Sequence, residues 1–172
     1  EYQVELLNGT VITIDPPVQL PDESTIKVIR EPWMKLEISS PVEFYGTIMD
    51  LARKRRGIFV SEEYPAPDRV QMNFEIPLAE LIVNFFDELK SRTRGYASMD
   101  YHMYEYRPGN LVKVEVLVGG EPVDALATIV HKEDAYHKGQ LLVTKLKSLI
   151  PRQMFDVAIQ SSASGRIISR AN

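Results

Sequence analysis

The chain has 172 residues, with 24 acidic and 20 basic side chains, 11 prolines, 9 glycines and no cysteine. Its apolar content of 44% beside 26% charged residues is typical of a globular protein and excludes wholesale disorder. The lack of cysteine excludes disulfides, thiolate metal sites and a cysteine nucleophile. No apolar run is long enough to span a bilayer, and the first residues do not form a signal peptide. Because the sequence opens at Glu1 without methionine, we expect it to be part of a longer protein.

Charge is distributed unevenly along the chain. Residues 1–32 carry two basic and six acidic side chains, residues 33–106 carry nine and twelve, and residues 107–172 carry nine and six. The basic balance of the last segment favours contact with an anionic partner.

The first fifteen residues predict a β-hairpin that ends a preceding domain. Apolar and polar residues alternate in 2–6 and 11–14, and Asn8-Gly9 between them favours a tight turn. Residues 16–30 contain Pro16, Pro17 and Pro21, which disfavour both helix and central strand, so this segment is predicted to be a linker.

Residues 31–106 predict a ferredoxin-like α+β domain with the order β-α-β-β-α-β. Strands are expected at 33–38, 58–60, 70–76 and 96–106. The first helix is expected to begin with a capping box formed by Ser40, Pro41, Val42 and Glu43. The second is expected to be one continuous helix, because apolar residues follow the helical period at Leu78, Leu81, Ile82, Phe85, Phe86 and Leu89.

Residues 107–172 predict a second small unit with the order β-β-α-β-β. Strands are expected at 111–118, 123–130, 155–159 and 166–168. A helix is expected from about Gly139 to Ile150, ending before Pro151, with one apolar face formed by Leu142, Leu146 and Leu149.

The sequence shows no catalytic or metal-binding motif. His131 and His137 are six residues apart, which does not place them on one helical face, and His102 lies in a tyrosine-rich strand. Gly119-Gly120 joins two strands and is not followed by Lys-Ser or Lys-Thr, so it is not a phosphate-binding loop. We therefore expect no catalytic residue, no metal site and no cofactor within this segment.

Basic residues form the candidate nucleic-acid-binding site. One cluster ends the first predicted helix and a second ends the other; they consist of Arg53, Lys54, Arg55, Arg56, Lys90, Arg92 and Arg94. Both helices are expected to lie on one face of the sheet and to run roughly parallel, which would bring the clusters to one end of the domain. Convergent lysines and arginines suit a phosphate backbone, although stabilisation by the helix dipole is a purely structural alternative.

The C-terminal part adds a second basic set. Its members are Lys132, Lys138, Lys145, Lys147, Arg152, Arg166 and Arg170. Base stacking by Tyr101, Tyr104 and Tyr106 is a minor alternative, because the strand lacks the motif of RNA-recognition sheets.

Several motifs resemble the domain V segment of the elongation factor G family. They are Glu31-Pro32-Trp33-Met34-Lys35, Arg55-Arg56-Gly57, Ile76-Pro77-Leu78-Ala79-Glu80 and Ser91-Arg92-Thr93-Arg94-Gly95-Tyr96-Ala97-Ser98. The continuation resembles the elongation factor 4 (LepA) family at Tyr106-Arg107-Pro108, Leu111-Val112-Lys113, Gly120-Glu121-Pro122-Val123-Asp124-Ala125-Leu126, Leu149-Ile150-Pro151-Arg152-Gln153-Met154-Phe155 and Ile159-Gln160.

The resemblance implies a ribosome-dependent GTPase that binds ribosome and tRNA and promotes back-translocation. It implies GTP with Mg²⁺ for the intact protein, whose GTP-binding domain is outside this sequence. It further implies that residues 1–15 end a domain III, that 31–106 are the domain V-like unit and that 107–172 begin a family-specific C-terminal domain. The implied partners are large-subunit rRNA, ribosomal proteins and tRNA, contacted by a cytoplasmic monomer that also associates peripherally with the cell membrane. Two alternatives stay open: the equivalent part of elongation factor G, and a module that binds ribosomal proteins.

Overall fold

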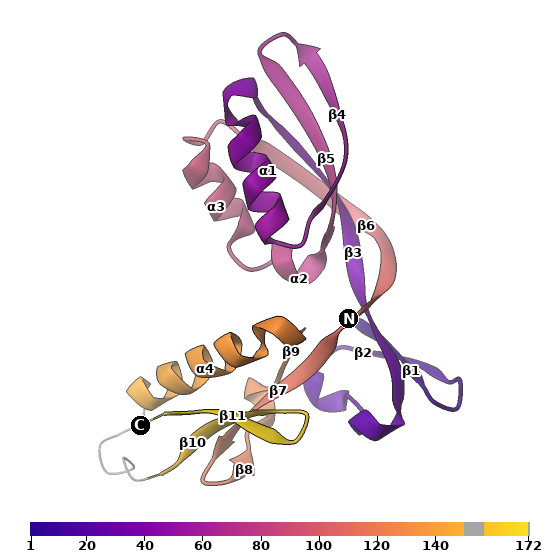
Figure 1. Cartoon of the computed structure of the whole chain (residues 1–172), viewed down its shortest axis with the longest axis vertical. Coiled ribbons are helices and arrows are strands. Elements are labelled where there is room, and N and C mark those ends of the chain that lie inside the picture. Colours follow the sequence, from indigo (N-terminus) through magenta and orange to yellow (C-terminus); the bar gives the residue numbers. More distant parts are fainter. Residues whose placement is uncertain (150–156, 172) are drawn as a thin grey trace. The chain divides into compact units, whose positions relative to one another are not determined.

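The chain forms two compact units in a computed structural model that describes residues 1–149 and 157–171 (Figure 1). The central unit comprises Glu31–Arg107. The terminal unit combines the two ends of the chain, Glu1–Arg30 and Pro108–Asn172.

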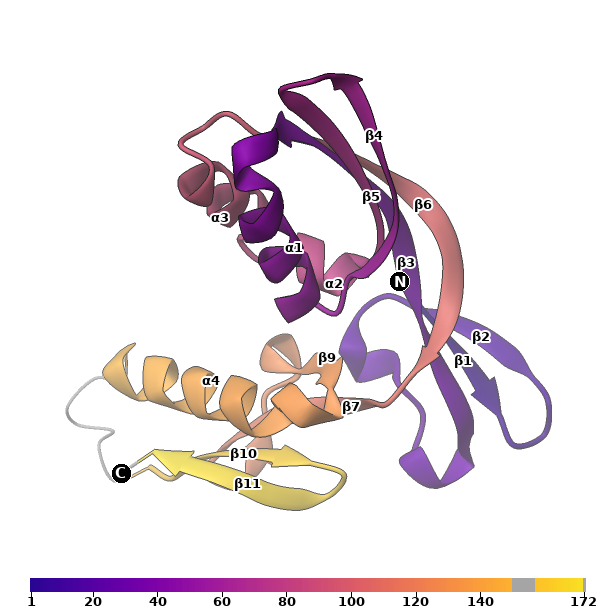
Figure 2. The ribbon, with the colours of Figure 1, turned by 45° about the horizontal axis from the view of Figure 1, so that its top comes forward.

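The central unit is a four-stranded sheet with helices on one face. Strand β3 (Ile26–Pro41) is followed by α1 (Tyr45–Lys54), β4 (Ile58–Ala66), β5 (Arg69–Pro77), α2 (Leu78–Leu81), α3 (Phe85–Arg92) and β6 (Ser98–Gly109). The strand order is β6-β3-β5-β4, and β5 is antiparallel to both of its neighbours. Figures 1 and 2 both show α1 and α3 on the same side of these strands. This arrangement confirms the predicted ferredoxin-like β-α-β-β-α-β fold.

The core of the central unit lies between its sheet and its helices. Alternate residues of β3 and β5 face inward and are fully or almost fully buried, including Leu36, Ile38, Met72, Phe74 and Ile76. The alternating apolar residues that predicted these strands are therefore the residues that form the core. From the helices, the largest buried contributions come from Ile48, Leu51, Phe85 and Leu89.

The prediction that the two helices run roughly parallel is wrong. Helix α1 follows β3 and α2–α3 follow β5, and these two strands are antiparallel neighbours. Helices that return over one face from antiparallel strands must themselves point in opposite directions. The end of α1 therefore lies beside the beginning of α3.

The second predicted helix is broken into α2 and α3. Asn84 adopts a left-handed backbone conformation with φ of 58°, which interrupts the helical turn. The break takes Ile82 and Phe86 out of the buried stripe, and their side chains are 69% and 50% exposed. Helical periodicity alone could not detect this break, because asparagine tolerates the left-handed region without disturbing the apolar pattern.

The predicted capping box is also wrong. Ser40 lies inside β3, is fully buried, and its hydroxyl donates to the carbonyl oxygen of Pro41. A 3₁₀ turn at Val42–Phe44 leads into α1, and no side chain caps it. The strand continues through the expected cap because its pairing with β5 extends to Pro41.

The terminal unit contains a second sheet covered by a long helix. Its elements are β7 (Leu111–Val118), β8 (Glu121–Pro122), β9 (Thr128–His131), α4 (Ala135–Leu149), β10 (Ile159–Ala163) and β11 (Arg166–Ala171). The order is β11-β10-β7, and β8 and β9 follow each other along the second edge of β7. The predicted β-β-α-β-β order is present, with its second strand split by a 3₁₀ turn at Asp124–Leu126. Leu149 is 70% exposed, so its predicted place on the apolar face is wrong.

The N-terminal hairpin packs within this same unit. Strands β1 (Tyr2–Leu6) and β2 (Val11–Ile14) pair with each other, and β1 pairs with the first residues of β3. Val4, Ile14 and Ile29 share an apolar cluster with Leu111 and Ile129. The sequence did not reveal this contact, because its partners are about a hundred residues apart along the chain.

The predicted linker over residues 16–30 is wrong in its second half. Residues 26–30 are the start of β3 and pair with β1. Between the hairpin and β3, the chain forms 3₁₀ turns at Pro17–Gln19 and Glu23–Thr25. The prolines exclude α-helix as expected, but they precede rather than interrupt the strand.

Candidate nucleic-acid interface

Two of the four residues of the first predicted basic cluster, Arg55 and Arg56, form internal ion pairs. The two Nη atoms of Arg56 donate to the two carboxylate oxygens of Glu31 at 2.7 and 3.0 Å, and Nε donates to Glu80 at 3.2 Å. The Glu31 side chain is 2% exposed, so it is a buried charge that needs this guanidinium as its counter-ion. Arg56 therefore has a structural partner, which weighs against its predicted role as a phosphate ligand.

Arg55 is held in the same way by the α2–α3 segment. Its Nη1 atom donates to the carbonyl oxygens of Glu80 and Val83 at 3.1 and 2.7 Å, and Nη2 donates to the carboxylate of Glu88 at 2.8 Å. Glu88 also accepts from Arg92, four residues later on α3, at 2.9 Å. The hydrogen bond from Arg55 is the main reason why the pKa of Glu88 lies below its ordinary value. These ion pairs also weigh against the predicted binding roles of Arg55 and Arg92.

The two predicted clusters meet only through Glu88, which binds Arg55 and Arg92, and their exposed members lie apart. Arg53 and Lys54 are exposed at the end of α1, whereas Lys90 and Arg94 lie at the end of α3. Because these helices run in opposite directions, the two pairs lie toward opposite ends of the helical layer. Lys90 is also occupied locally, since its Nζ donates to the carbonyl oxygen of Gly95 at 3.3 Å and lies 5.6 Å from the centre of the Phe86 ring.

One aromatic ring of β6, that of Tyr104, is occupied by cations of the same unit, whereas Tyr101 is 45% exposed. The Nζ atom of Lys35 lies 4.4 Å above the centre of the Tyr104 ring, and the guanidinium of Arg107 lies 5.6 Å from the same centre. Arg107 also lies 4.6 Å from the Trp33 ring and is bound to Glu75 at 2.9 Å. Of the three tyrosines considered for base stacking, Tyr104 therefore already has cations over its ring. These contacts weigh against the minor alternative of base stacking at this residue.

A different group of basic residues lies in segments whose own sequence contains no acid. We call residues 135–149 and 157–171 the cationic sector; they form α4, β10 and β11 and contain no aspartate or glutamate. The basic residues of this sector are Lys138, Lys145, Lys147, Arg166 and Arg170. The rest of the described terminal unit, residues 1–30 and 108–134, has four basic and ten acidic side chains, a net charge of −6. Opposite charges are therefore separated within one unit.

Helix α4 presents its lysines because its other face is packed closely on the sheet. Ala135, Gly139 and Val143, at helical spacing, are its buried residues. A Cβ atom on Gly139 would collide with the hydroxyl of Ser161, so only glycine permits this close approach. Lys138 and Lys145 are seven residues apart, which places them on one side of the helix about 10.5 Å apart along its axis.

The predicted residues of this region are only partly brought together. Among the described residues, Lys138, Lys145, Arg166 and Arg170 form no ion pair with an acid. Arg170 pairs with Gln160, the neighbour of the buried Ile159 and Ser161, so it lies on the sheet face opposite α4. Lys132 is exposed beside Glu133 and Asp134, outside the sector, and Arg152 lies outside the described residues.

Neither a metal cluster nor a membrane-spanning helix is found in the described part of the chain. No group of three or more histidine, aspartate or glutamate side chains is placed to hold a metal ion there. None of the helices described combines the length and apolar character needed to cross a membrane.

Comparison with known proteins assigns the chain to a family. A model described as "Elongation factor G C-terminus" matches residues 28–117, which is more than half of the chain. The chain belongs to this family. A second model, described as "GTP-binding protein LepA C-terminus", matches residues 118–172.

Individual relatives agree with this assignment. The chain is 48% identical over 170 residues to elongation factor 4 of Halalkalibacterium halodurans and 47% identical over 171 residues to elongation factor 4 of Streptococcus pneumoniae strain Hungary19A-6. Each alignment covers 99% of this chain but only 28% of the relative. A crystal structure of a protein from Thermus thermophilus matches 47% of this chain and 12% of its own, with a TM-score of 0.44 and 25% identity.

The two family models cover different groups of basic residues. The elongation factor G model covers the whole central unit, including the arginines that form internal ion pairs. The cationic sector lies entirely in the segment that matches the LepA model. Sequence reasoning found the basic residues but missed Glu31, Glu80 and Glu88. Local charge patterns do not identify these acids, because they lie 24 to 33 residues from their partners.

Proposed function

We propose that this chain is the ribosome-binding C-terminal part of a translational GTPase of the elongation factor 4 type, and that its cationic sector binds RNA. The observation that carries the proposal is the absence of any acidic residue from the described α4, β10 and β11. RNA phosphates bind lysine and arginine mainly through charge neutralisation and counterion release, so nearby carboxylates would oppose the contact.

The helix supplies a rigid support for this contact. The backbone of α4 is fixed by Gly139 against Ser161, and Lys138 and Lys145 extend from the same side of it. Arg166, in the β10–β11 hairpin, is a further exposed cation of the sector. Residues that already neutralise a carboxylate, such as Arg55 and Arg56, have no comparable charge left to give a phosphate.

The proposal extends to the whole protein in a coarser form. The relatives are elongation factor 4 proteins, so we assign the intact protein a role at the ribosome, with rRNA and tRNA as RNA partners and back-translocation as the supported step. GTP and Mg²⁺ belong to the intact protein, and none of the described residues is assigned to them. The central unit would contribute packing and orientation rather than most of the charge.

Salt-dependent binding to purified large ribosomal subunits tests the proposal. Replacing Lys138 and Lys145 by glutamine should weaken binding and reduce the slope of log affinity against log salt by about 1.4, since each single-stranded phosphate contact contributes about 0.7. The matched control replaces Lys27 and Lys35, two exposed lysines outside the sector, and should leave the slope unchanged. Equal slopes for the two double variants would overturn the assignment to α4.

A third double variant separates the two candidate surfaces. Arg53→Gln with Lys54→Gln removes the exposed cations that remain at the end of α1. If this variant lowers the slope and the α4 variant does not, the central unit binds the RNA and the present assignment is wrong. We expect the reverse.

A further inference from the structure

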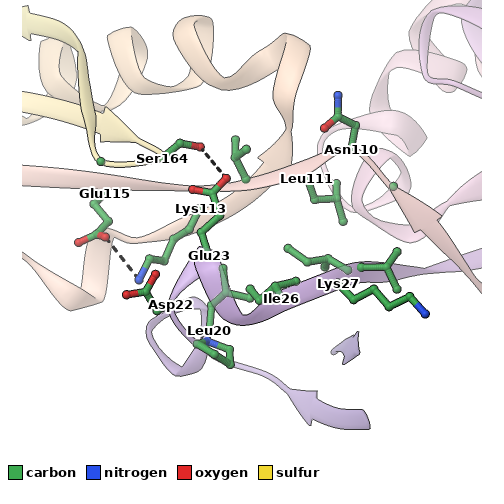
Figure 3. Close-up of a pocket in the computed structure, with 16 residues that line it drawn as sticks. Leu20, Asp22, Glu23, Ile26, Lys27, Asn110, Leu111, Lys113, Glu115 and Ser164 are labelled. Atoms are coloured by element: carbon green, nitrogen blue, oxygen red, sulfur yellow. Dashed lines mark hydrogen bonds and ion pairs between the residues drawn. The ribbon is translucent and has the colours of Figure 1, made fainter. Parts of the chain in front are cut away.

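The terminal unit contains a cavity in its acidic part, away from the cationic sector's helix. Its volume is about 590 Å³. One wall is the segment from Leu20 to Ile29, the other is the beginning of β7, and the β10–β11 turn contributes Ser164 and Gly165 (Figure 3). All of these residues belong to the same compact unit.

Part of the cavity lining is aliphatic, beside polar and charged side chains. Leu20, Ile26, Ile29 and Leu111 line it and also belong to the apolar cluster that joins the N-terminal hairpin to β7. Figure 3 shows Leu20 and Ile26 on one wall and Leu111 on the other. A lining of this kind accommodates methylene groups without leaving polar atoms unpaired.

The mouth of the cavity carries five charged side chains, of which the two lysines are already neutralised. Lys113 Nζ lies 3.4 Å from Glu115, and Lys27 Nζ lies 3.4 Å from Glu5. The remaining carboxylates are those of Asp22 and Glu23, on the wall opposite β7.

Asp22 and Glu23 receive hydrogen bonds only from neutral groups among the described residues. Asp22 accepts from the backbone and hydroxyl of Ser24, each at 3.1 Å, and Glu23 accepts from the Ser164 hydroxyl at 3.2 Å. Neither carboxylate has a lysine or arginine within ion-pair distance in the described chain. These two negative charges in the cavity lining therefore have no ion-pair partner in the described part of the chain.

We propose that this cavity binds a lysine or arginine side chain of an extended, basic polypeptide segment. The aliphatic stem would lie against Leu20, Ile26 and Leu111, and the cationic head would pair with Asp22 and Glu23. The surrounding charge selects the occupant, because residues 1–30 and 108–134 carry a net charge of −6 and repel nucleic acid.

The strand arrangement beside the cavity suits an extended chain. Strand β10 pairs with β7 only from Val114 onward, so Leu111–Lys113 extends past the end of β10 along the cavity. An extended peptide lying there would present alternate side chains to the cavity. The terminal unit thus has two separate binding surfaces with opposite requirements, one for RNA and one for a basic protein segment.

NMR titration of the ¹⁵N-labelled chain tests this inference. The probe is the acetylated and amidated peptide Lys-Val-Arg-Val-Lys, and the control peptide is Glu-Val-Glu-Val-Glu. The basic peptide should shift the amide signals of Asp22, Glu23 and Ser164, and the acidic one should not. Shifts confined to other regions, or equal shifts with both peptides, would overturn the proposal.

Two variants separate specific binding from general charge attraction. Asp22→Asn with Glu23→Gln keeps the neutral hydrogen bonds and should weaken binding of the peptide about two- to thirtyfold, since two exposed ion pairs are lost. Glu121→Gln with Asp124→Asn makes the same change of charge outside the cavity and should leave the affinity unchanged.

A third variant tests the cavity without changing charge. Asn110→Trp places a large side chain at an exposed position of the lining and should abolish the peptide-induced shifts. Unaltered signals elsewhere in its spectrum would show that the variant is folded. Full binding by a folded Asn110→Trp chain would contradict the proposal even if the charge variants behave as expected.

Discussion

The two units use their basic residues in opposite ways. In the central unit, Arg55, Arg56 and Arg92 neutralise Glu31, Glu80 and Glu88 and so join α1 to β3 and to the α2–α3 segment. In the terminal unit, helix α4 has lysines but no acid, and close packing at Gly139 holds it in place instead. The difference teaches that a basic cluster becomes a candidate binding surface only when the fold brings no carboxylate to it.

The largest expected effect tests the structural role in the central unit. Arg56→Ala leaves the carboxylate of Glu31, which is 2% exposed, without its counter-ion, and we expect a loss of about 3–5 kcal/mol in unfolding free energy. Urea denaturation followed by the fluorescence of Trp33, the only tryptophan, measures the central unit.

The matched control for this change is Arg94→Ala. Arg94 has the same left-handed backbone, with φ of 54° against 60° for Arg56, but it is exposed and makes no ion pair with a described residue. Its loss should cost less than about 0.5 kcal/mol. Similar losses in both variants would assign the effect to the backbone instead of the ion pair, and the comparison would fail.

A smaller effect tests the close packing of α4. Gly139→Ala forces a Cβ against Ser161, and we expect a net destabilisation of about 1–2 kcal/mol despite the better helix propensity of alanine. The control is Gly46→Ala in α1, where nothing lies within 4 Å of the added Cβ and where stability should rise. Thermal denaturation of the two variants gives the comparison. Stabilisation by both changes would show that α4 is not held by this contact.

The smallest effect is a pH dependence of the central unit. The pKa of Glu88 is lowered in the folded state, so its pairing stabilises the fold above the ordinary glutamate value of 4.5 and is lost as the pH falls through the folded value. Urea midpoints at neutral pH and below pH 4 should differ less in Glu88→Gln than in the unaltered chain. Asp87→Asn, which removes an exposed neighbour on the same helix, should retain the full dependence.

Local patterns in the sequence were sufficient for the order of elements but not for their ends or contacts. Alternation and helical spacing predicted the strands and helices of the central unit. The left-handed Asn84 and the buried Ser40 were not predictable: Asn84 interrupts an unbroken helical pattern, and Ser40 belongs to a strand whose pairing continues to Pro41. The error in helix direction was avoidable, since the predicted antiparallel sheet already requires antiparallel helices.

The candidate site shows the same division between local and distant information. The basic residues and the excess of positive charge after residue 107 were visible in the sequence. The sequence does not show which of these cations is free to bind a phosphate. Glu31 and Glu88 pair with Arg56 and Arg55, which lie 25 and 33 residues away along the chain. The absence of acids from α4 is visible in the sequence alone. It indicates a binding surface only in contrast with Arg55, Arg56 and Arg92, which the structure shows to be paired with acids.

The separation of charge within the terminal unit has a consequence for handling the protein. A chain with net charge −4 is expected to adsorb to an anion exchanger, yet the acid-free face of α4 should also retain it on a heparin column. Chromatographic behaviour will thus be decided by which side of the molecule meets the resin rather than by the isoelectric point.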